Sequence, residues 1–470
     1  MKRKIRKLHI IALSGLLLLA GCSKTFTVQT PVDSVPLDQA LATEGDINAA
    51  LNGAYANLRN IYGTLFLPMG DVQADNTYVE FRNSGRYIPQ YSYTVTIEDA
   101  YVGQMWSQSY RGILRANQVI DAKVTSGKAA AIKAEAYAIR ALLYFKLVNI
   151  YAKSYRDDPD ALGVPLVLTY LPYLLPVRST VKQVYTQIVS DLKVAFKDAP
   201  DYVNSVHLSK YAIEGLLAKV YLYQGDFPNA KAAADDVINN SQFSLVRAAN
   251  FNAFWANPAI QSDQAEVMFE VDADAVNNNG FDDVSSLYIN GYQDLYASSQ
   301  LYDLYRSSDI RKTLLVPGTT KSGSPAYLVN KFSNARNGDK DNLKVIRFSE
   351  IYLIAAEASL PGDEMAAKGY LNALVAQRDP GLVYTSAGTG LLNDIVQERR
   401  KELAFEGDRF YDLNRLKLPI NRAPNPGAIP AGQNDVNLSI PYPDYKRLAP
   451  IPKDEILANP MIAPQQNPGY

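Results

Sequence analysis

The chain has 470 residues, of which 47% are apolar and 20% are charged, a composition typical of a globular protein with a large core. Its 47 lysine and arginine residues nearly balance its 48 aspartate and glutamate residues, so the sequence provides no basic field for nucleic acid. Tyrosine is abundant, with 32 residues, whereas there are only two histidines and one cysteine. These three counts limit the possible chemistry more than the length does.

The N-terminus is predicted to direct export. Five basic residues precede an apolar run of 11 residues that ends at Ala20, which is too short to span a membrane but suits a signal peptide. The run ends in Leu-Ala-Gly-Cys at 19–22, which resembles a bacterial lipobox. We therefore expect residues 1–21 to be removed and Cys22 to be lipidated. An ordinary signal peptide next to a chance cysteine is the alternative.

The predicted mature chain has few residues suited to catalysis. Removal of the leader leaves 42 basic and 48 acidic residues, a formal charge of −6. His207 would be the remaining histidine, and the cysteine would carry lipid, which excludes a disulfide, a cysteine nucleophile and a two-histidine metal site. The residues around His207 look like a helix start, which favours a capping or surface role. Carboxylate chemistry, as in glycosidases, remains open.

The mature chain begins with a predicted tether at residues 22–43, which contains two prolines and no helical periodicity. A helix is expected over 44–62. Residues 63–100 then lose the helical period and gain aromatic residues, which predicts a long loop with a short strand at 91–97. Loops of this length in a compact domain are often functional.

Three further helices are expected at 99–123, 129–155 and 181–197. Apolar residues spaced three and four apart mark one buried face on the second of these helices. Thr180 and Gln183 resemble a capping box at the start of the third.

Two later segments, 217–237 and 354–374, share a spacing of small and apolar residues that is similar to tetratricopeptide repeats. Gly225 and Gly362 fall at the expected turns, and the small residues would let two helices approach closely. The copies lie 137 residues apart, so they are not a simple tandem array, and two unrelated hairpins are the alternative. Helical repeats usually form scaffolds and binding surfaces rather than active sites.

Two more blocks are predicted to be irregular. Residues 241–346 contain turn strings such as Asn-Asn-Asn-Gly at 277–280, and residues 419–452 contain eight prolines. No linker divides residues 44–470. The sequence therefore predicts one mainly α domain, in which helix pairs form a scaffold for a loop-rich portion.

Several motifs, in one order along the mature chain, resemble the SusD/RagB family of Bacteroidetes outer-membrane lipoproteins. They include Trp-Ser-Gln-Ser-Tyr at 106–110, Gly-Val-Pro-Leu at 163–166, Arg-Phe-Ser-Glu at 347–350, the charged run 398–409, and Gln-Asn-Pro-Gly-Tyr at 466–470. The resemblance implies four tetratricopeptide-like helix pairs that support a loop-rich ligand-binding part. It also implies a nutrient-binding lipoprotein at the outer face of the outer membrane, which caps a SusC-like, TonB-dependent transporter. The usual ligands would be oligosaccharides or polysaccharides, and peptides for some members.

The charged run 398–409 is interpreted as a structural ion-pair network. Glu402 and Glu406 lie four residues apart on one helix face, so their carboxylates point alongside each other and not across a substrate. Interleaved basic groups would also lower the pKa values of these carboxyls, which does not suit a glycosidase acid. A calcium-like string at 272–277 fails at Val276, its third ligand position. No catalytic residue, metal site or cofactor is therefore predicted.

The positive signal for sugar binding is the abundance of tyrosine, because an aromatic ring packs on the apolar face of a pyranose and the hydroxyl can still form a hydrogen bond. Tyrosines in predicted helices are expected to be core residues. The candidates for ligand contact are the aromatic residues of the irregular loops, namely Tyr78, Phe81, Tyr87, Tyr288, Tyr292 and Tyr296. We expect the loops 75–95 and 275–300 to converge on one face of the scaffold.

The sequence thus favours a non-catalytic glycan-binding lipoprotein that delivers its ligand to a SusC-like transporter. The alternatives are a carboxylate-based surface glycosidase, a peptide-binding member of the same family, and a helical scaffold that binds protein alone.

Overall fold

The structure is a computed structural model that describes residues 40–433 and 436–470. Its long helices are α3 (Glu44–Asn60), α6 (Ala100–Asp121), α7 (Gly127–Tyr151), α8 (Val181–Asp198), α9 (Lys210–Gln224), α10 (Phe227–Asn240), α14 (Phe348–Ser359), α15 (Glu364–Val375) and α16 (Gly388–Glu402). The shorter helices are α4 (Leu67–Gln73), α5 (Ile88–Ser92), α11 (Phe251–Ala256), α12 (Val284–Tyr288), α13 (Ser299–Tyr302), α17 (Arg409–Arg415) and α18 (Lys453–Ala458). The strands are β1 (Thr77–Val79), β2 (Val267–Val271), β3 (Leu295–Ala297), β4 (Leu315–Thr319), β5 (Pro325–Val329), β6 (Leu343–Arg347), β7 (Ile420–Asn421) and β8 (Ser439–Ile440).

Some of the sequence-based predictions fall beyond this part of the chain. The signal peptide 1–21, the lipidated Cys22 and most of the tether 22–43 lie outside the described residues. Within the described residues, no helix combines the length and the apolar character that crossing a membrane requires.

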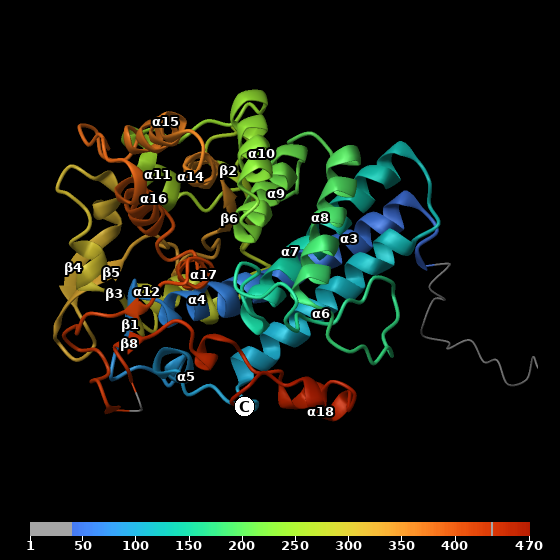
Figure 1. The fold of residues 1–470 in the computed structure, drawn as a ribbon, viewed down its shortest axis with the longest axis horizontal. Helices are drawn as coiled ribbons and strands as arrows, with labels where there is room; N and C mark the ends of the chain where they lie inside the picture. The colour runs from blue at the N-terminus through green and yellow to red at the C-terminus, as the bar shows by residue number, and fades with distance from the viewer. Residues whose placement is uncertain (1–39, 434–435) are drawn as a thin grey trace, which may run out of the picture.

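The long helices form a continuous scaffold. Each one packs against the next along the chain, from α3 through α6, α7, α8, α9 and α10 to α14 and α15. In the part of the chain that the structure describes, this order gives four neighbouring helix pairs, α3/α6, α7/α8, α9/α10 and α14/α15. They occupy the right-hand and upper parts of Figure 1. The predicted mainly α fold with helix pairs is confirmed.

The sequence signals for helix ends are found at the expected places. The Thr180 N–H donates to Gln183 Oε1 over 2.8 Å, and the Gln183 N–H donates to Thr180 Oγ1 over 3.2 Å, so the capping box of α8 is complete. Gly225 ends α9 with φ at 78°, a conformation that side chains with a Cβ rarely adopt. The tight turn at this glycine lets α10 fold back on α9, as the repeat-like pattern predicted.

Part of the block 63–100, predicted to be irregular, is helical. α3 continues through a π-helical turn, η2 (Ile61–Phe66), into α4. Nearly all side chains from 61 to 72 are buried, so the segment has no polar face and its sequence shows no helical period. Gly70 allows close packing here, because a Cβ at this position would lie 2.1 Å from the carbonyl oxygen of Gly407.

The strand predicted at 91–97 is absent from the described residues, and that prediction was wrong. The short helix α5 ends at Ser92 and is followed by Tyr93 in the left-handed region, with φ at 59°. Tyr91 and Tyr93, two residues apart in the predicted strand, have another role. Both rings pack around the buried guanidinium of Arg422, whose carbon lies 4.4 Å from one ring centroid and 5.2 Å from the other.

His207 lies just before α9, as the sequence suggested, and is partly exposed. Its Nδ1 is 3.0 Å from Glu135 Oε2, and this hydrogen bond raises the pKa of the imidazole above its ordinary value of 6.5. Glu135 also accepts a hydrogen bond from the Tyr55 hydroxyl. The histidine thus ties the α8–α9 connection to α7 and α3.

The loop-rich portion fills the left-hand part of Figure 1. Its main sheet has the strand order β1-β3-β5-β4, with every neighbouring pair antiparallel. The strands β2 and β6 form a separate antiparallel pair that packs on α9, and β7 pairs with β8. Strand β1, from the block 63–100, and strands β3, β4 and β5, from the block 241–346, therefore share one sheet.

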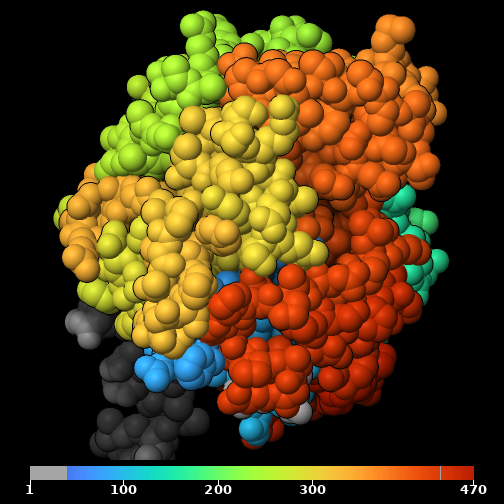
Figure 2. All heavy atoms as spheres, turned by 90° about the vertical axis from the view of Figure 1, so that its left-hand side faces the viewer, coloured from blue at the N-terminus to red at the C-terminus, as the bar shows by residue number. Residues whose placement is uncertain are grey.

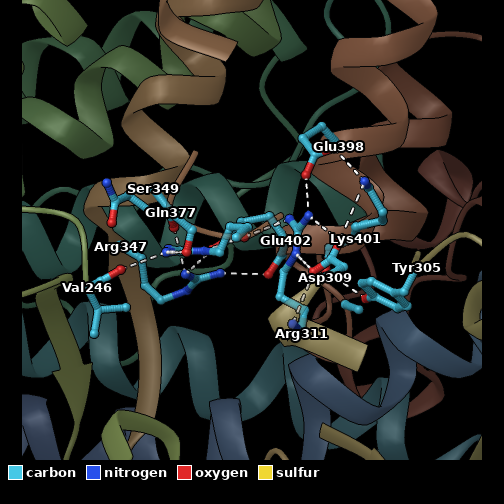
Figure 3. A network of polar contacts seen from close by, with 12 residues as sticks. Val246, Tyr305, Asp309, Arg311, Arg347, Ser349, Gln377, Glu398, Lys401 and Glu402 are labelled. Atoms are coloured by element: carbon cyan, nitrogen blue, oxygen red, sulfur yellow. Dashed lines mark hydrogen bonds and ion pairs between the residues drawn. The ribbon is translucent and has the colours of Figure 1, made fainter. Parts of the chain in front are cut away.

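A buried ion-pair network joins this portion to the scaffold, and Figure 3 shows its central part. The carboxylate of Glu402, at the end of α16, accepts hydrogen bonds from Arg311, Arg347 and Arg378 at 2.8–3.2 Å. Burial alone would raise the pKa of Glu402, but attraction to the three guanidinium groups holds it well below its usual range. Glu406 is bound in turn by Arg347 and by Lys331, at 2.7 and 2.6 Å. The predicted ion-pair network is confirmed.

A second buried network lies next to the first, around α17. Asp408 accepts a hydrogen bond from Lys219 of α9 over 2.7 Å. Arg399 bridges Glu350 of α14 and Asp412 of α17 at 2.5 and 2.7 Å. The charged run 398–409 therefore fixes α16 and α17 against two helices of the scaffold.

The central position of Glu402 leads to a stability prediction. Glu402→Gln leaves three buried guanidinium groups without their shared counter-charge, so we expect the free energy of unfolding to fall by about 3–5 kcal/mol. Chemical denaturation followed by circular dichroism measures this loss. Asp454→Asn, the same change at an exposed position of α18, is the control and should have almost no effect. An equal stability of the two variants would contradict the central role of Glu402.

Candidate ligand-binding site

The two aromatic loops singled out in the sequence lie together in the structure. β1 and β3 pair with Tyr78 opposite Tyr296. Beyond the strands, the Ser84 N–H donates to Asp294 Oδ1 over 3.0 Å, and Lys321 forms an ion pair with the same carboxylate at 2.7 Å. Loops 75–95 and 275–300 therefore converge, as predicted.

Four of the six candidate residues, however, are core residues. The side chains of Tyr78, Tyr87, Tyr288 and Tyr296 are at most 2% exposed, so they cannot stack on a ligand in this structure. Tyr78 stacks on Tyr296 with ring centroids 5.7 Å apart. The Tyr87 hydroxyl donates to the carbonyl of residue 64 over 2.8 Å. The turns between these residues are at the surface, but their aromatic side chains point inward and fill the space beneath the loops.

The remaining two candidates reach the surface. Phe81 is exposed, and its N–H donates to the carbonyl oxygen of Gly427 over 3.0 Å. Tyr292 is partly exposed, and the guanidinium carbon of Arg86 lies 3.8 Å from its ring centroid. Asp282 fixes this pair, because it forms an ion pair with Arg86 at 2.8 Å and accepts a hydrogen bond from the Tyr292 hydroxyl over 3.3 Å. Tyr292 is therefore in contact with both Arg86 and Asp282 at the surface.

Phe281 was missed in the sequence. It directly follows the Asn-Asn-Asn-Gly turn at 277–280, and that turn was the available signal that the next side chain would be presented outward. Its side chain is 60% exposed, and its ring meets that of Tyr292 edge to face, with centroids 5.6 Å apart. Phe281, Tyr292 and Arg86 together form the aromatic rim.

An open depression of about 660 Å³ lies beside the aromatic rim. Its lining includes Phe281, the amide residues Asn278, Asn290 and Asn337, and the basic residues Arg336 and Lys340. Figure 2 views this end of the molecule, where the light-blue segment around residue 85 reaches the surface below the yellow and light-orange segments. The Asn278 amide and the Lys340 ammonium are already bound to backbone carbonyl oxygens of this chain. The ring of Phe281 with the amide of Asn290 and the guanidinium of Arg336 suits a hydroxyl-rich ligand, because the ring can pack on an apolar sugar face while the polar groups form hydrogen bonds with hydroxyls.

The carboxylate pair considered for a glycosidase does not face this surface. Glu402 and Glu406 are buried and bound to basic side chains in the network described above. A glycosidase acid needs a raised pKa and access to the substrate, and the pKa values of both groups are lowered. This pair therefore has neither the protonation state nor the access that the reaction requires.

Comparison with known proteins agrees with the fold and the motifs. Residues 32–222 match the family model described as "Starch-binding associating with outer membrane", and residues 318–470 match the model of the SusD family. The chain belongs to the SusD/RagB family. The family is associated with the outer membrane, and the tetratricopeptide-like helix pairs described above are its scaffold.

Similar relatives span almost the whole chain. A SusD-like protein P2 of Formosa agariphila is 29% identical over 99% of this chain and its own full length. The crystal structure of a SusD superfamily protein from Bacteroides vulgatus, also 29% identical, has a TM-score of 0.82 over 91% of this chain and 99% of its own. A structure described as a laminarin-binding SusD-like protein, 25% identical, has a TM-score of 0.71 over 91% of this chain and 99% of its own.

Tyr288, a core residue of α12, leads to a pH prediction through its partner Asp71. The Tyr288 hydroxyl donates to Asp71 Oδ2 over 2.7 Å, and burial raises the pKa of Asp71 to about 7. Between about pH 4 and 7 the folded chain keeps a proton that the unfolded chain has lost, so this group reduces stability increasingly as the pH rises. We expect Asp71→Asn to gain in melting temperature relative to the wild type between about pH 5 and 8.

The matched control for this experiment is Asp75→Asn. Burial opposes ionisation of Asp75 as well, but attraction to Arg409 and Arg400 gives a net lowering of its pKa. The folded and unfolded chains both carry this group ionised between about pH 5 and 8, so the control should be destabilised by a nearly constant amount. Parallel pH profiles for the two variants would contradict the assignment to Asp71.

Proposed function

We propose that the protein is a non-catalytic lipoprotein that captures oligosaccharide or polysaccharide outside the cell and delivers it to a SusC-like, TonB-dependent transporter. The observation that carries the proposal is the open depression beside Phe281 and Tyr292, where an aromatic rim lies next to the polar side chains of Asn290 and Arg336. A family model described as starch-binding and a laminarin-binding relative support a glycan as the ligand class.

The geometry of the surface suits a polymer better than a small molecule. The depression is wide and open, and its aromatic rings are held by contacts within the protein before any ligand arrives. Each sugar would make few contacts, so the affinity for a short oligosaccharide should be modest and should rise with chain length as more sugars engage. Binding of a neutral glycan should depend little on salt.

Export and anchoring follow from the N-terminal sequence. Cys22 would be the lipidated first residue of the mature chain, with residues 23–43 connecting it to α3. The lipid would hold the protein at the outer membrane, facing outward, beside the transporter that it caps. Recognition takes place on loops that a rigid helical scaffold positions, an arrangement suited to binding and delivery rather than to chemistry.

The first functional prediction concerns the aromatic rim. Phe281→Ala and Tyr292→Ala should each weaken binding of laminarin or another retained glycan by about tenfold. Phe281→Ala should leave the melting temperature unchanged, because its ring is exposed, whereas Tyr292→Ala removes a partly buried ring and should lower it slightly. Isothermal titration calorimetry, after a screen on a glycan panel, measures the loss. The panel also detects catalysis, since a glycosidase would release product.

Two controls accompany these variants. Tyr445→Ala removes a comparably exposed ring outside the aromatic rim and should leave binding intact. Tyr288→Ala removes a fully buried ring and should lower the melting temperature substantially. If both rim variants bind glycan normally, the site assignment fails. If the protein retains peptides and no glycans on the same panel, the proposed ligand class is wrong.

The second functional prediction concerns the anchor. Cys22→Ala should release the protein from the membrane fraction or leave its signal peptide uncleaved, because the acylated residue is lost. Ser23→Ala is the neighbouring control and should remain in the membrane fraction. Fractionation followed by immunoblotting separates these outcomes, and membrane association of both variants alike would refute the lipoprotein assignment.

A further inference from the structure

The open depression beside the aromatic rim carries positive charge that no carboxylate in its lining balances. Arg336 and Lys340 are lining residues, and no aspartate or glutamate is among the residues that the described chain contributes to the lining. The predicted mature chain has a formal charge of −6, so the depression differs in charge from the chain as a whole. This difference bears on which glycans the surface can bind.

Arg336 provides an exposed guanidinium to the depression. Within the described residues, its side chain makes one hydrogen bond, from Nε to the carbonyl oxygen of Asn290 over 3.4 Å, and no ion pair. The two terminal nitrogens, Nη1 and Nη2, are therefore left to a ligand. Two parallel N–H groups of this kind match the two oxygens of a carboxylate or a sulfate.

Lys340 adds a second cation to the same depression. Its ammonium donates to the carbonyl oxygen of Ala335, and in the part of the chain that the structure describes it forms no ion pair. Asp283 lies near enough for the charge of Lys340 to lower its pKa, but burial is the larger effect and raises that pKa to about 6. Because the Lys340 side chain is mostly buried, it contributes the field of its charge rather than a direct contact.

Two carboxylates that are close to these lining residues in the sequence do not cancel the charge of Arg336. Asp282, next to Phe281, forms an ion pair with Arg86 at 2.8 Å. Asp339 lies near enough to Asp272 to help raise the pKa of that carboxyl, and it is not one of the lining residues. Neither Asp282 nor Asp339 is in ion-pair contact with Arg336 in the described structure.

We propose that the depression selects anionic glycans, in which the carboxylate or sulfate of a bound sugar pairs with Arg336 while a sugar ring packs on Phe281. The inference rests on the proposed function, because it names the ligand class of the same surface. An aromatic ring accepts neutral and acidic sugars alike, whereas a guanidinium attracts an anion more strongly than a neutral hydroxyl. The Debye length is about 8 Å at physiological ionic strength, so distant carboxylates of the chain weaken this attraction little.

The test compares acidic and neutral forms of the same glycan. Oligogalacturonides and alginate oligosaccharides are used as free acids and as methyl esters, carrageenan oligosaccharides are used with and without their sulfates, and laminarin oligosaccharides are the neutral reference. Isothermal titration calorimetry on the mature chain in detergent gives an acid-to-neutral ratio of affinities for each pair. We expect a ratio of about ten for at least one pair at about 50 mM NaCl, and a ratio near one at about 500 mM, because salt screens the attraction. The carboxylated and sulfated pairs distinguish the two anionic groups.

Arg336→Gln should reduce the ratio at low salt to about one, and Arg336→Lys should retain part of it, because lysine keeps the charge but not the paired nitrogens. Arg111→Gln, which changes an exposed arginine of α6 in the scaffold, is the matched control and should keep the wild-type ratio. Glycan binding with a wild-type ratio near one for every pair would overturn the inference and leave the proposed function standing. A ratio that Arg336→Gln does not change would overturn the inference as well. If the protein binds no glycan of the set, both the inference and the proposed function are wrong.

Discussion

The structure depends on the charge balance around one carboxylate, Glu402. Its two oxygens accept hydrogen bonds from arginines that belong to three separate parts of the chain: the turn before β4, the end of β6 and the turn after α15. None of these guanidinium groups could be buried alone, because removing a single charge from water costs several kcal/mol. Helical scaffold and loop-rich portion must therefore come together in one arrangement for Glu402 to bind all three arginines. The network thus favours this arrangement over alternative packings of the same helices.

Sequence patterns predicted the scaffold better than the loops. Capping signals and small residues at repeat-like spacing act locally, so Thr180, Gln183 and Gly225 could be interpreted without knowing their neighbours. The η2–α4 segment could not, because its helix is buried on all sides and no periodicity marks it. The roles of Tyr91 and Tyr93 could not be predicted from local sequence either, because both rings pack around Arg422, more than three hundred residues later in the chain.

For the candidate site, the sequence predicted the loops and their convergence, but four of the six side chains it named are buried. In the sequence, Tyr78 and Tyr296 both appear as aromatic residues in turn-rich segments. In the structure, they stack on each other inside the protein. Burial on a loop depends on which distant segment covers it, and no local pattern encodes that. Phe281 is distinguished only by the Asn-Gly turn before it, so residue-level assignment of the surface required the structure.

The pairing of β1 with distant segments has a consequence for how the protein matures. Tyr78 lies opposite Tyr296, which is 218 residues later in the chain. The Phe81 N–H also donates to the carbonyl oxygen of Gly427, and the Ile429 N–H donates to that of Val79. Helix pairs such as α6/α7 involve near neighbours and can close early, whereas contacts of such high contact order form late. Helix pairs near the N-terminus can therefore form before β1 pairs with β3, and the two aromatic loops come together only once the C-terminal half of the chain is in place.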